Sequence, residues 1–318
     1  MPSDTPVVST RDALEFYRRG RVEEAERAAR AILEAQPSNF DAQHLLGVTL
    51  LWRADFDGAE AAFSRALAVN PQSREANLHH AASLRYLKRS EESLRRYDEI
   101  IAGNSQIGEA HYGRACVMID LGRVEDACQS YAAAARVLET DADLFNDYGI
   151  ALMRLHRYEE AIAAYDRSIA LGLGKPPTPT YGRAWNNRGI ALFLAARFEE
   201  SVASFNAALA VDPNYIEALY HRGAALMSVW ETQQQNMKLI DDAIASYDAA
   251  LALKLDFAEA FNGRGMAMLQ AARAKEGLAS FDKALALRPD YEPSQKGREL
   301  CLAQLGRDAA YDPLKVQL

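Results

Sequence analysis

Residues 182–213 read GRAWNNRGIALFLAARFEESVASFNAALAVDP, and the pattern of this stretch returns throughout the chain with changed letters. Aligned without gaps at a period of 34 residues, five copies occupy residues 6–175 and three more occupy residues 182–291. Six residues separate the two blocks, and the seventh copy carries eight extra residues. A repeat of this length predicts an array of similar structural units rather than one large globular core.

Four columns of this alignment keep their character in every copy or nearly every copy. Column 8 is always glycine or alanine, column 20 is always small, and column 11 is always apolar. Column 24 is aromatic in seven of the eight copies, at Phe63, Tyr97, Tyr131, Tyr165, Phe205, Tyr247 and Phe281. Small or apolar residues at columns 4, 7, 8 and 11 have the spacing of one helix face, and columns 20, 24 and 27 give a second helix that spacing. Each copy therefore predicts a helix pair, with the column 24 ring filling the groove between one pair and the next.

This pattern resembles the tetratricopeptide repeat, which has W-x2-L-G-x2-Y, then A-x3-F, then P on 34 residues. The fullest matches are the segment Trp185 to Gly189 with Phe205 and Pro213, and Phe261 with Gly265, Phe281 and Pro289. The resemblance implies an all-α fold, a right-handed α-solenoid superhelix of stacked antiparallel helix pairs. The first copy departs from the pattern by lacking the column 24 aromatic, and four copies lack the closing proline.

The alignment also predicts how the chain is organised. Its expected parts are a disordered N-terminus at 1–5, repeats 1–5 at 6–175, a Pro-rich insertion at 176–181, repeats 6–8 at 182–291, a capping helix at 292–306 and a tail at 307–318. Ser9 to Asp12 predict a capping box on the first helix, and the terminal helix is expected to be polar and to end at Gly306.

The two insertions have open interpretations. The Pro-rich segment cannot be helical and is expected to bulge out or to act as a hinge. The eight extra residues, near 229–242, add roughly one turn to each helix of repeat 7, or they project as a contact element that uses exposed Trp230 and Met237.

Composition and charge exclude several classes of protein. Hydrophobic residues make up 49% of the chain, which is too many for a disordered protein, and no apolar run is long enough to cross a bilayer. The net charge of −8 disfavours nucleic acid as a partner. Three cysteines without a CxxC pattern indicate neither a disulfide framework nor a zinc site. The N-terminus lacks the pattern of a secretory signal, so the expected compartment is the cytoplasm.

No motif indicates catalysis. The chain has no GxSxG, no HExxH and no dinucleotide-binding glycine motif after a strand, and Gly174-Lys175 is followed by Pro176 instead of the serine or threonine of a phosphate loop. His79 and His80 are adjacent, and neighbours on a helix point about 100° apart, so they cannot share a metal. Acidic residues at columns 2, 18 and 19 lie in first turns of helices, where they interact favourably with the macrodipole. We therefore expect no enzyme activity, no cofactor and no metal.

The remaining surface is the stripe at columns 5, 9 and 12 of each first helix, which forms the concave groove in tetratricopeptide proteins. The candidate peptide-binding residues there and beside it are His44, Val48, Trp52, Leu78, Arg85, Tyr86, Tyr112, Asn146, Ile150, Met153, Asn186, Asn187, Ile190, Phe193, Tyr220, His221, Met227, Asn262 and Met266. Aromatics and methionines supply adaptable contact area, and asparagine amides can donate to and accept from an extended peptide backbone. Alternatively, some of these side chains simply contact the next repeat.

The leading hypothesis is a non-enzymatic bacterial-type scaffold that binds an extended or helical peptide segment of a protein partner. No copy has the lysine at column 5 that a chaperone-tail clamp needs. One alternative is the substrate-recruiting arm of a larger or multi-subunit enzyme, such as a protein glycosyltransferase. Self-assembly through the repeat ends is a third possibility, although a monomer is favoured.

Overall fold

The structure is a computed structural model, and it describes residues 9–174, 178–233 and 236–310. Within these ranges the only regular elements are α-helices, which confirms the all-α fold of helix pairs. The chain divides into two compact units, Met1–Leu144 and Phe145–Leu318, which we call the N-terminal and C-terminal units, and the boundary falls inside α9.

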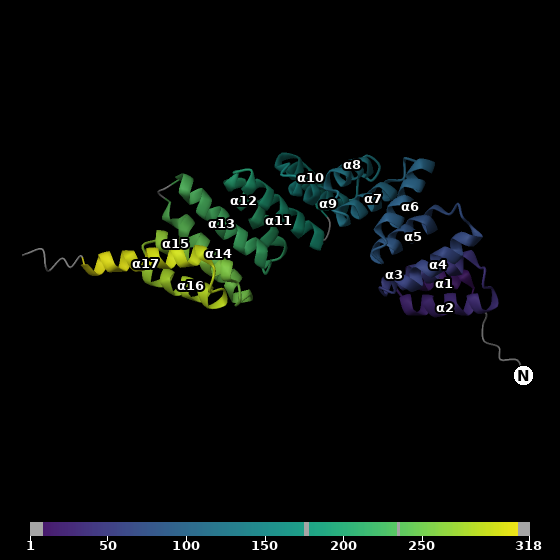
Figure 1. Ribbon diagram of the computed structural model, residues 1–318, viewed down its shortest axis with the longest axis horizontal. Helices are drawn as coiled ribbons and strands as arrows, with labels where there is room; N and C mark the ends of the chain where they lie inside the picture. Colours follow the sequence, from purple (N-terminus) through teal and green to yellow (C-terminus); the bar gives the residue numbers. More distant parts are fainter. Residues whose placement is uncertain (1–8, 175–177, 234–235, 311–318) are drawn as a thin grey trace, which may run out of the picture. The chain divides into compact units, whose positions relative to one another are not determined.

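The helices follow the predicted repeat (Figure 1). In the N-terminal unit they are α1 (Thr10–Arg18), α2 (Val22–Ala35), α3 (Phe40–Trp52), α4 (Phe56–Val69), α5 (Arg74–Tyr86), α6 (Ser90–Gly103), α7 (Gly108–Asp120) and α8 (Val124–Ala135). The boundary helix α9 (Ala142–Arg154) is followed by α10 (Tyr158–Gly172), α11 (Pro179–Leu194), α12 (Phe198–Val211), α13 (Ile216–Gln233), α14 (Met237–Leu253), α15 (Ala258–Gln270), α16 (Ala274–Leu287) and α17 (Glu292–Ala310). From α1 to α8, and again from α10 to α17, each helix packs on the next.

First helices of successive repeats also contact each other. In the N-terminal unit α3 contacts α5 and α5 contacts α7, and in the C-terminal unit α11 contacts α13 and α13 contacts α15. Within each unit the first helices therefore share one side of the stack.

The column 24 rings pack between helices of successive repeats. Tyr247 of α14 lies between Gly223 of α13 and Gly263 of α15, and a Cβ atom added to these glycines would lie 2.8 and 2.6 Å from the ring. Phe281 lies in the same way between Gly265 and Gly297. This confirms the prediction that the ring fills the groove between two helix pairs, and it shows that the glycines make room for the ring.

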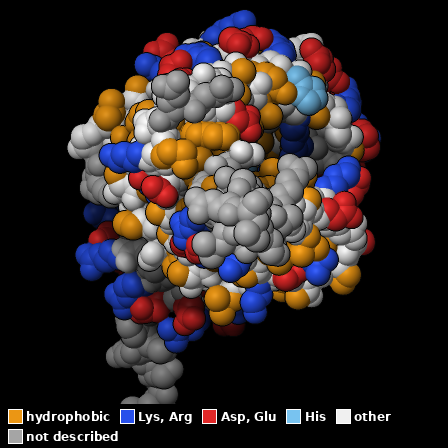
Figure 2. Space-filling view, turned by 90° about the vertical axis from the view of Figure 1, so that its left-hand side faces the viewer, with side chains coloured by type: hydrophobic (Ala, Val, Ile, Leu, Met, Phe, Trp, Pro, Cys, Tyr) orange, Lys and Arg blue, Asp and Glu red, His pale blue; other side chains and the backbone are white. Residues whose placement is uncertain are grey.

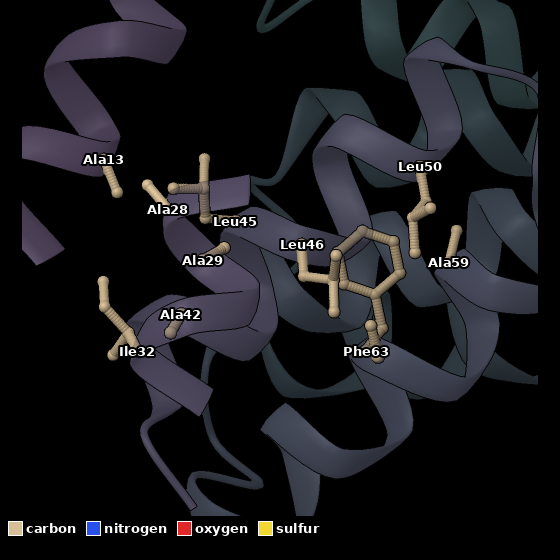
Figure 3. Packing of buried hydrophobic residues seen from close by; sticks show 11 residues of the cluster. Ala13, Ala28, Ala29, Ile32, Ala42, Leu45, Leu46, Leu50, Ala59 and Phe63 are labelled. Carbon is tan, nitrogen blue, oxygen red and sulfur yellow. The ribbon is translucent and has the colours of Figure 1, made fainter. Parts of the chain in front are cut away.

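The first repeat, which lacks the ring, is closed by small side chains. Ala29 occupies column 24 there and is fully buried, close to Ala28 and Leu45, whereas Phe63 of the second repeat lies beside Leu46 (Figure 3). In the N-terminal unit, the core of the first repeat is therefore rich in alanine, and column 24 rings are part of the core from the second repeat onwards.

Column 7 differs from the prediction of a small or apolar position. Arg188 stands there in repeat 6, where its Nε donates to Asp166 Oδ1 of the preceding repeat at 2.6 Å and its Nη1 donates to Ser204 Oγ at 2.6 Å. The same bridge to the preceding repeat links Arg114 to Asp98, Arg264 to Asp248 and Arg298 to Asp282. An arginine suits this position because its aliphatic stem packs between helices while its guanidinium reaches a carboxylate at the edge.

The structure contradicts part of the prediction for the Pro-rich insertion and decides between the two interpretations of the insertion in repeat 7. α11 begins at Pro179 with Thr178 as its N-cap, so residues 179–181 are helical, because proline is accepted in the first turn of a helix; residues 175–177 lie outside the described residues. α13 and α14 have 18 and 17 residues, against 13 and 14 for α15 and α16, which confirms the longer hairpin. Trp230 is half-buried against the neighbouring core, so its expected exposure is wrong, whereas Met237 is exposed.

The two ends of the described chain differ in how well the sequence predicted them. Ser9 and Asp12 form the expected capping box on α1. α17 continues to Ala310 instead of ending at Gly306, because a lone glycine costs about 1 kcal/mol against alanine and does not by itself stop a helix. α17 also exposes Leu300 and Leu302, and Figure 2, which views the chain from the end that carries α17, shows hydrophobic side chains between charged ones. The expected disordered N-terminus at 1–5 and the end of the tail at 311–318 lie outside the described residues.

The turn inside most helix pairs contains a left-handed residue, which is glycine at Gly20 and Gly122 but not elsewhere. Ala272 has a φ of 58° and Ala196 one of 59°, a conformation that costs a residue with a Cβ about 1–2 kcal/mol. We expect Ala272→Gly and Ala196→Gly each to raise the free energy of unfolding by about 0.5–1 kcal/mol in urea titrations. The neighbouring Ala195 has a φ of −82°, so Ala195→Gly should lower it instead.

Candidate functional site

The first-helix surface of the N-terminal unit presents two exposed aromatics. Trp52 is 70% exposed and its Nε1 donates to the Tyr17 hydroxyl at 3.1 Å, while Tyr86 is 50% exposed and stacks on Phe56 with centroids 4.7 Å apart. Arg85 beside them donates through Nε to Asp120 Oδ2 at 2.6 Å. These contacts fix the orientation of the aromatics and leave much of each ring open to a partner. Val48, Leu78 and Tyr112, also predicted here, are half-buried.

His44 belongs to a pair of imidazoles in this unit. Its Nε2 lies 3.0 Å from Nδ1 of His79, and the two rings stack with centroids 5.2 Å apart. Burial lowers the pKa of both histidines, against an opposing effect of Glu75, which acts on both, and of Asp41, which acts on His44. In the parts of the chain that the structure describes, no three histidine, cysteine, aspartate or glutamate side chains lie close enough together to hold a metal ion.

Because burial lowers the pKa of His44 and His79, we expect the folded protein to lose stability in mild acid. Because their pKa values lie below the 6.5 of an exposed histidine, the unfolded chain binds more protons once the pH falls below about 6.5. The free energy of unfolding should therefore be lower at pH 5.5 than at pH 7.5, which urea titrations would measure. The double variant His44→Gln, His79→Gln should show a smaller difference between the two pH values. An equal difference in variant and wild type would contradict the assignment.

Three asparagines of the C-terminal unit form a chain of amides. Asn187 donates through Nδ2 to Asn146 Oδ1 at 3.1 Å, and Asn186 donates through Nδ2 to Asn187 Oδ1 at 3.5 Å. Asn146 and Asn186 are only 3% and 4% exposed, so the prediction that they face a bound peptide is wrong. Their amides bind Asn187, which is half-buried, although the Oδ1 atom of Asn186 is buried without a hydrogen-bond partner.

A pocket of about 290 Å³ lies beside Asn187. It brings together four predicted residues, Ile150 and Met153 of α9 and Asn187 and Ile190 of α11. Sequence reasoning missed the two other lining residues. Arg154 stands at column 13, the column that also holds Trp52 and Tyr86, so the pattern contained a signal for it. The repeat pattern predicts Tyr165 as a core residue, and its ring, which is 1% exposed, also lines the pocket.

The other predicted residues of the C-terminal unit lie outside this pocket and contact side chains of their own or neighbouring repeats. The ring of Tyr220 lies 5.0 Å from that of Phe257, and His221, whose pKa burial lowers, stacks on Phe205 at 5.8 Å. Asn262 Oδ1 accepts from the Ser294 hydroxyl at 2.9 Å. Phe193 and Met227 pack against neighbouring buried clusters, and Met266 is half-buried. For these residues, apart from Met266, contact within the repeat stack accounts for much of the side chain.

The known proteins that this chain resembles are helix-pair repeat proteins. Family models of the tetratricopeptide repeat match residues 11–73, 140–214 and 238–292. No curated protein matches the chain in sequence. In the described ranges, no helix has the length and apolar character needed to cross a membrane.

Three solved structures illustrate the likeness. A chain of the APC/C hetero-tetramer Cut9–Hcn1 is 18% identical with a TM-score of 0.54, and the match covers 91% of this chain but 54% of that one. PilW, a type IV pilus biogenesis factor, is 19% identical with a TM-score of 0.55, covering 71% of this chain and 98% of PilW. YrrB, described as having an unusual peptide-binding site, is 18% identical with a TM-score of 0.53, covering 64% of this chain and 97% of YrrB. Since the family models match more than half of its residues and these structures share its fold, the chain belongs to the tetratricopeptide repeat family.

Proposed function

We propose that the protein is a non-enzymatic interaction scaffold that holds a peptide segment of a protein partner against its first helices. The observation that carries this proposal is the pocket between α9, α10 and α11, where an amide held in position by two buried asparagines adjoins three apolar side chains. Tetratricopeptide repeat proteins bind protein or peptide partners, and the fold neighbour YrrB is described as having a peptide-binding site. The exposed Trp52 and Tyr86 offer a second contact area on the N-terminal unit.

The chemistry of the pocket suits a peptide. Asn187 uses one Nδ2 hydrogen and one Oδ1 lone pair within the amide chain, which leaves one donor and one acceptor for a peptide group. Ile150, Met153 and Ile190 provide an apolar wall for a side chain of that peptide. Such a site holds a backbone by paired hydrogen bonds and an anchor side chain by burial of apolar surface.

A peptide library displayed on phage tests the proposal. Wild-type protein should enrich a set of peptides, and Ile150→Asp, which places a charge in the pocket, should weaken their binding at least tenfold, about 1.4 kcal/mol. Ile150 is 36% exposed, so circular dichroism should show an unchanged fold. Leu255→Asp is the matched control, because Leu255 is 78% exposed and does not line the pocket. Failure to enrich any peptide, or equal binding by Ile150→Asp, would overturn the proposal.

A further inference from the structure

Arg154 differs from the other arginines of the C-terminal unit. Over the described part of residues 145–306, all other arginines have an ion pair, a hydrogen bond or a ring contact; Arg188 and Arg197, for example, bind Asp166 and Glu200. Arg154 has none of these with any described residue, and its side chain is exposed at the rim of the pocket. A guanidinium has five donors and no acceptor, so Arg154 can bind an acidic group that a partner brings to the pocket.

The pocket contains no counter-charge for this arginine. None of its six lining residues is acidic. The carboxylate of Asp147, one helical turn before Ile150, accepts a hydrogen bond from Asn146 Nδ2 at 3.4 Å. Burial, and secondarily Asp147, raise the pKa of Tyr165, so the phenol at the pocket floor stays neutral. The site therefore combines an apolar wall, a neutral floor and a single unpaired cation at its edge.

We propose, building on the proposed function, that this pocket selects a peptide in which an apolar side chain lies close in sequence to an aspartate or glutamate. The apolar side chain lies against Ile150, Met153 and Ile190, and Asn187 binds the peptide backbone beside it. Arg154 binds the acidic side chain, since a guanidinium and a carboxylate can form two parallel hydrogen bonds. The partner of this scaffold is thus a protein with an exposed acidic and apolar segment.

Phage selection on charge-reversed variants tests the assignment. Peptides enriched on wild type should carry aspartate or glutamate near the apolar anchor, and Arg154→Glu should bind them at least tenfold more weakly and enrich peptides with lysine or arginine there instead. Lys283→Glu makes the same change in charge at an exposed residue of α16 outside the pocket, and it should enrich the wild-type set. Circular dichroism of each variant would confirm an unchanged fold.

A synthetic peptide from the wild-type selection gives a second readout. Changing its acidic residue to the neutral amide should weaken binding to wild type at least fivefold and should leave binding to Arg154→Gln nearly unchanged. Enriched peptides without acidic residues, bound equally by Arg154→Glu, would overturn this inference while the scaffold proposal stands. Peptides that bind only through a free C-terminal carboxylate would also overturn it. Absence of any enriched peptide would overturn both.

Discussion

Replacing Phe205 by alanine lowers the free energy of unfolding by about 3–5 kcal/mol, because the ring is fully buried and its removal leaves a cavity that rigid helices cannot close. Phe205 lies on Gly189 of the same repeat, where an added Cβ would come within 2.7 Å of the ring. The backbone of α11 therefore approaches the ring too closely to move further into the gap. Urea titration followed by circular dichroism measures the loss.

Two variants on the same helix serve as controls. Phe205→Leu retains much of the volume and should cost about 1–2 kcal/mol. Phe198 also lies on α12 but is half-buried, so Phe198→Ala should cost less than half as much as Phe205→Ala. If the two alanine variants proved equally stable, column 24 would not be the position that holds neighbouring helix pairs together.

Gly297→Ala is expected to detach the terminal helix. A Cβ atom at this position would lie 2.3 Å from Cζ of Phe281, a ring that is fully buried and cannot move aside. The overlap costs about 1–3 kcal/mol, and α16 and α17 move apart to relieve it. Amide hydrogen exchange should then show α17 exchanging faster than α16.

Gly306→Ala is the matched control for this prediction, because the same change is made on the same helix. No atom lies within 4 Å of a Cβ added to Gly306, so alanine should stabilise the helix by up to about 1 kcal/mol. The two substitutions should therefore have opposite signs. Destabilisation by both would mean that helix propensity, and not contact with Phe281, determines the result.

The repeat pattern predicted the fold because packing acts on every copy in the same way. A ring at column 24 requires a small residue at column 8, since Gly223 makes room for Tyr247 in the same repeat. Column 7 could not be predicted by the same reasoning. Arg188 is a charged residue on a packed face, and it is accommodated only because Asp166, 22 residues earlier, comes within hydrogen-bonding distance in the folded chain.

Helical periodicity also explains why only part of the candidate site could be predicted from the sequence. Helical periodicity indicates which side of a helix a residue faces, and four of the predicted residues, Ile150, Met153, Asn187 and Ile190, line one pocket. It does not state how deep a side chain lies. Asn186 occupies the expected column but is buried, and its Nδ2 donates to the amide oxygen of the adjacent Asn187.

The contacts between successive repeats of the C-terminal unit are alike, so one repeat could take the place of the next. Arg264 meets Asp248 in the way that Arg298 meets Asp282, and the ring of Tyr247 meets Gly263 as that of Phe281 meets Gly297. Excision of residues 264–297 would bring Arg298 to the place of Arg264, beside Asp248, and would leave the contact of Tyr247 with Gly263 in place. An array joined in this way can lose or duplicate a whole period and remain folded, so its length can change during evolution while each joint stays intact.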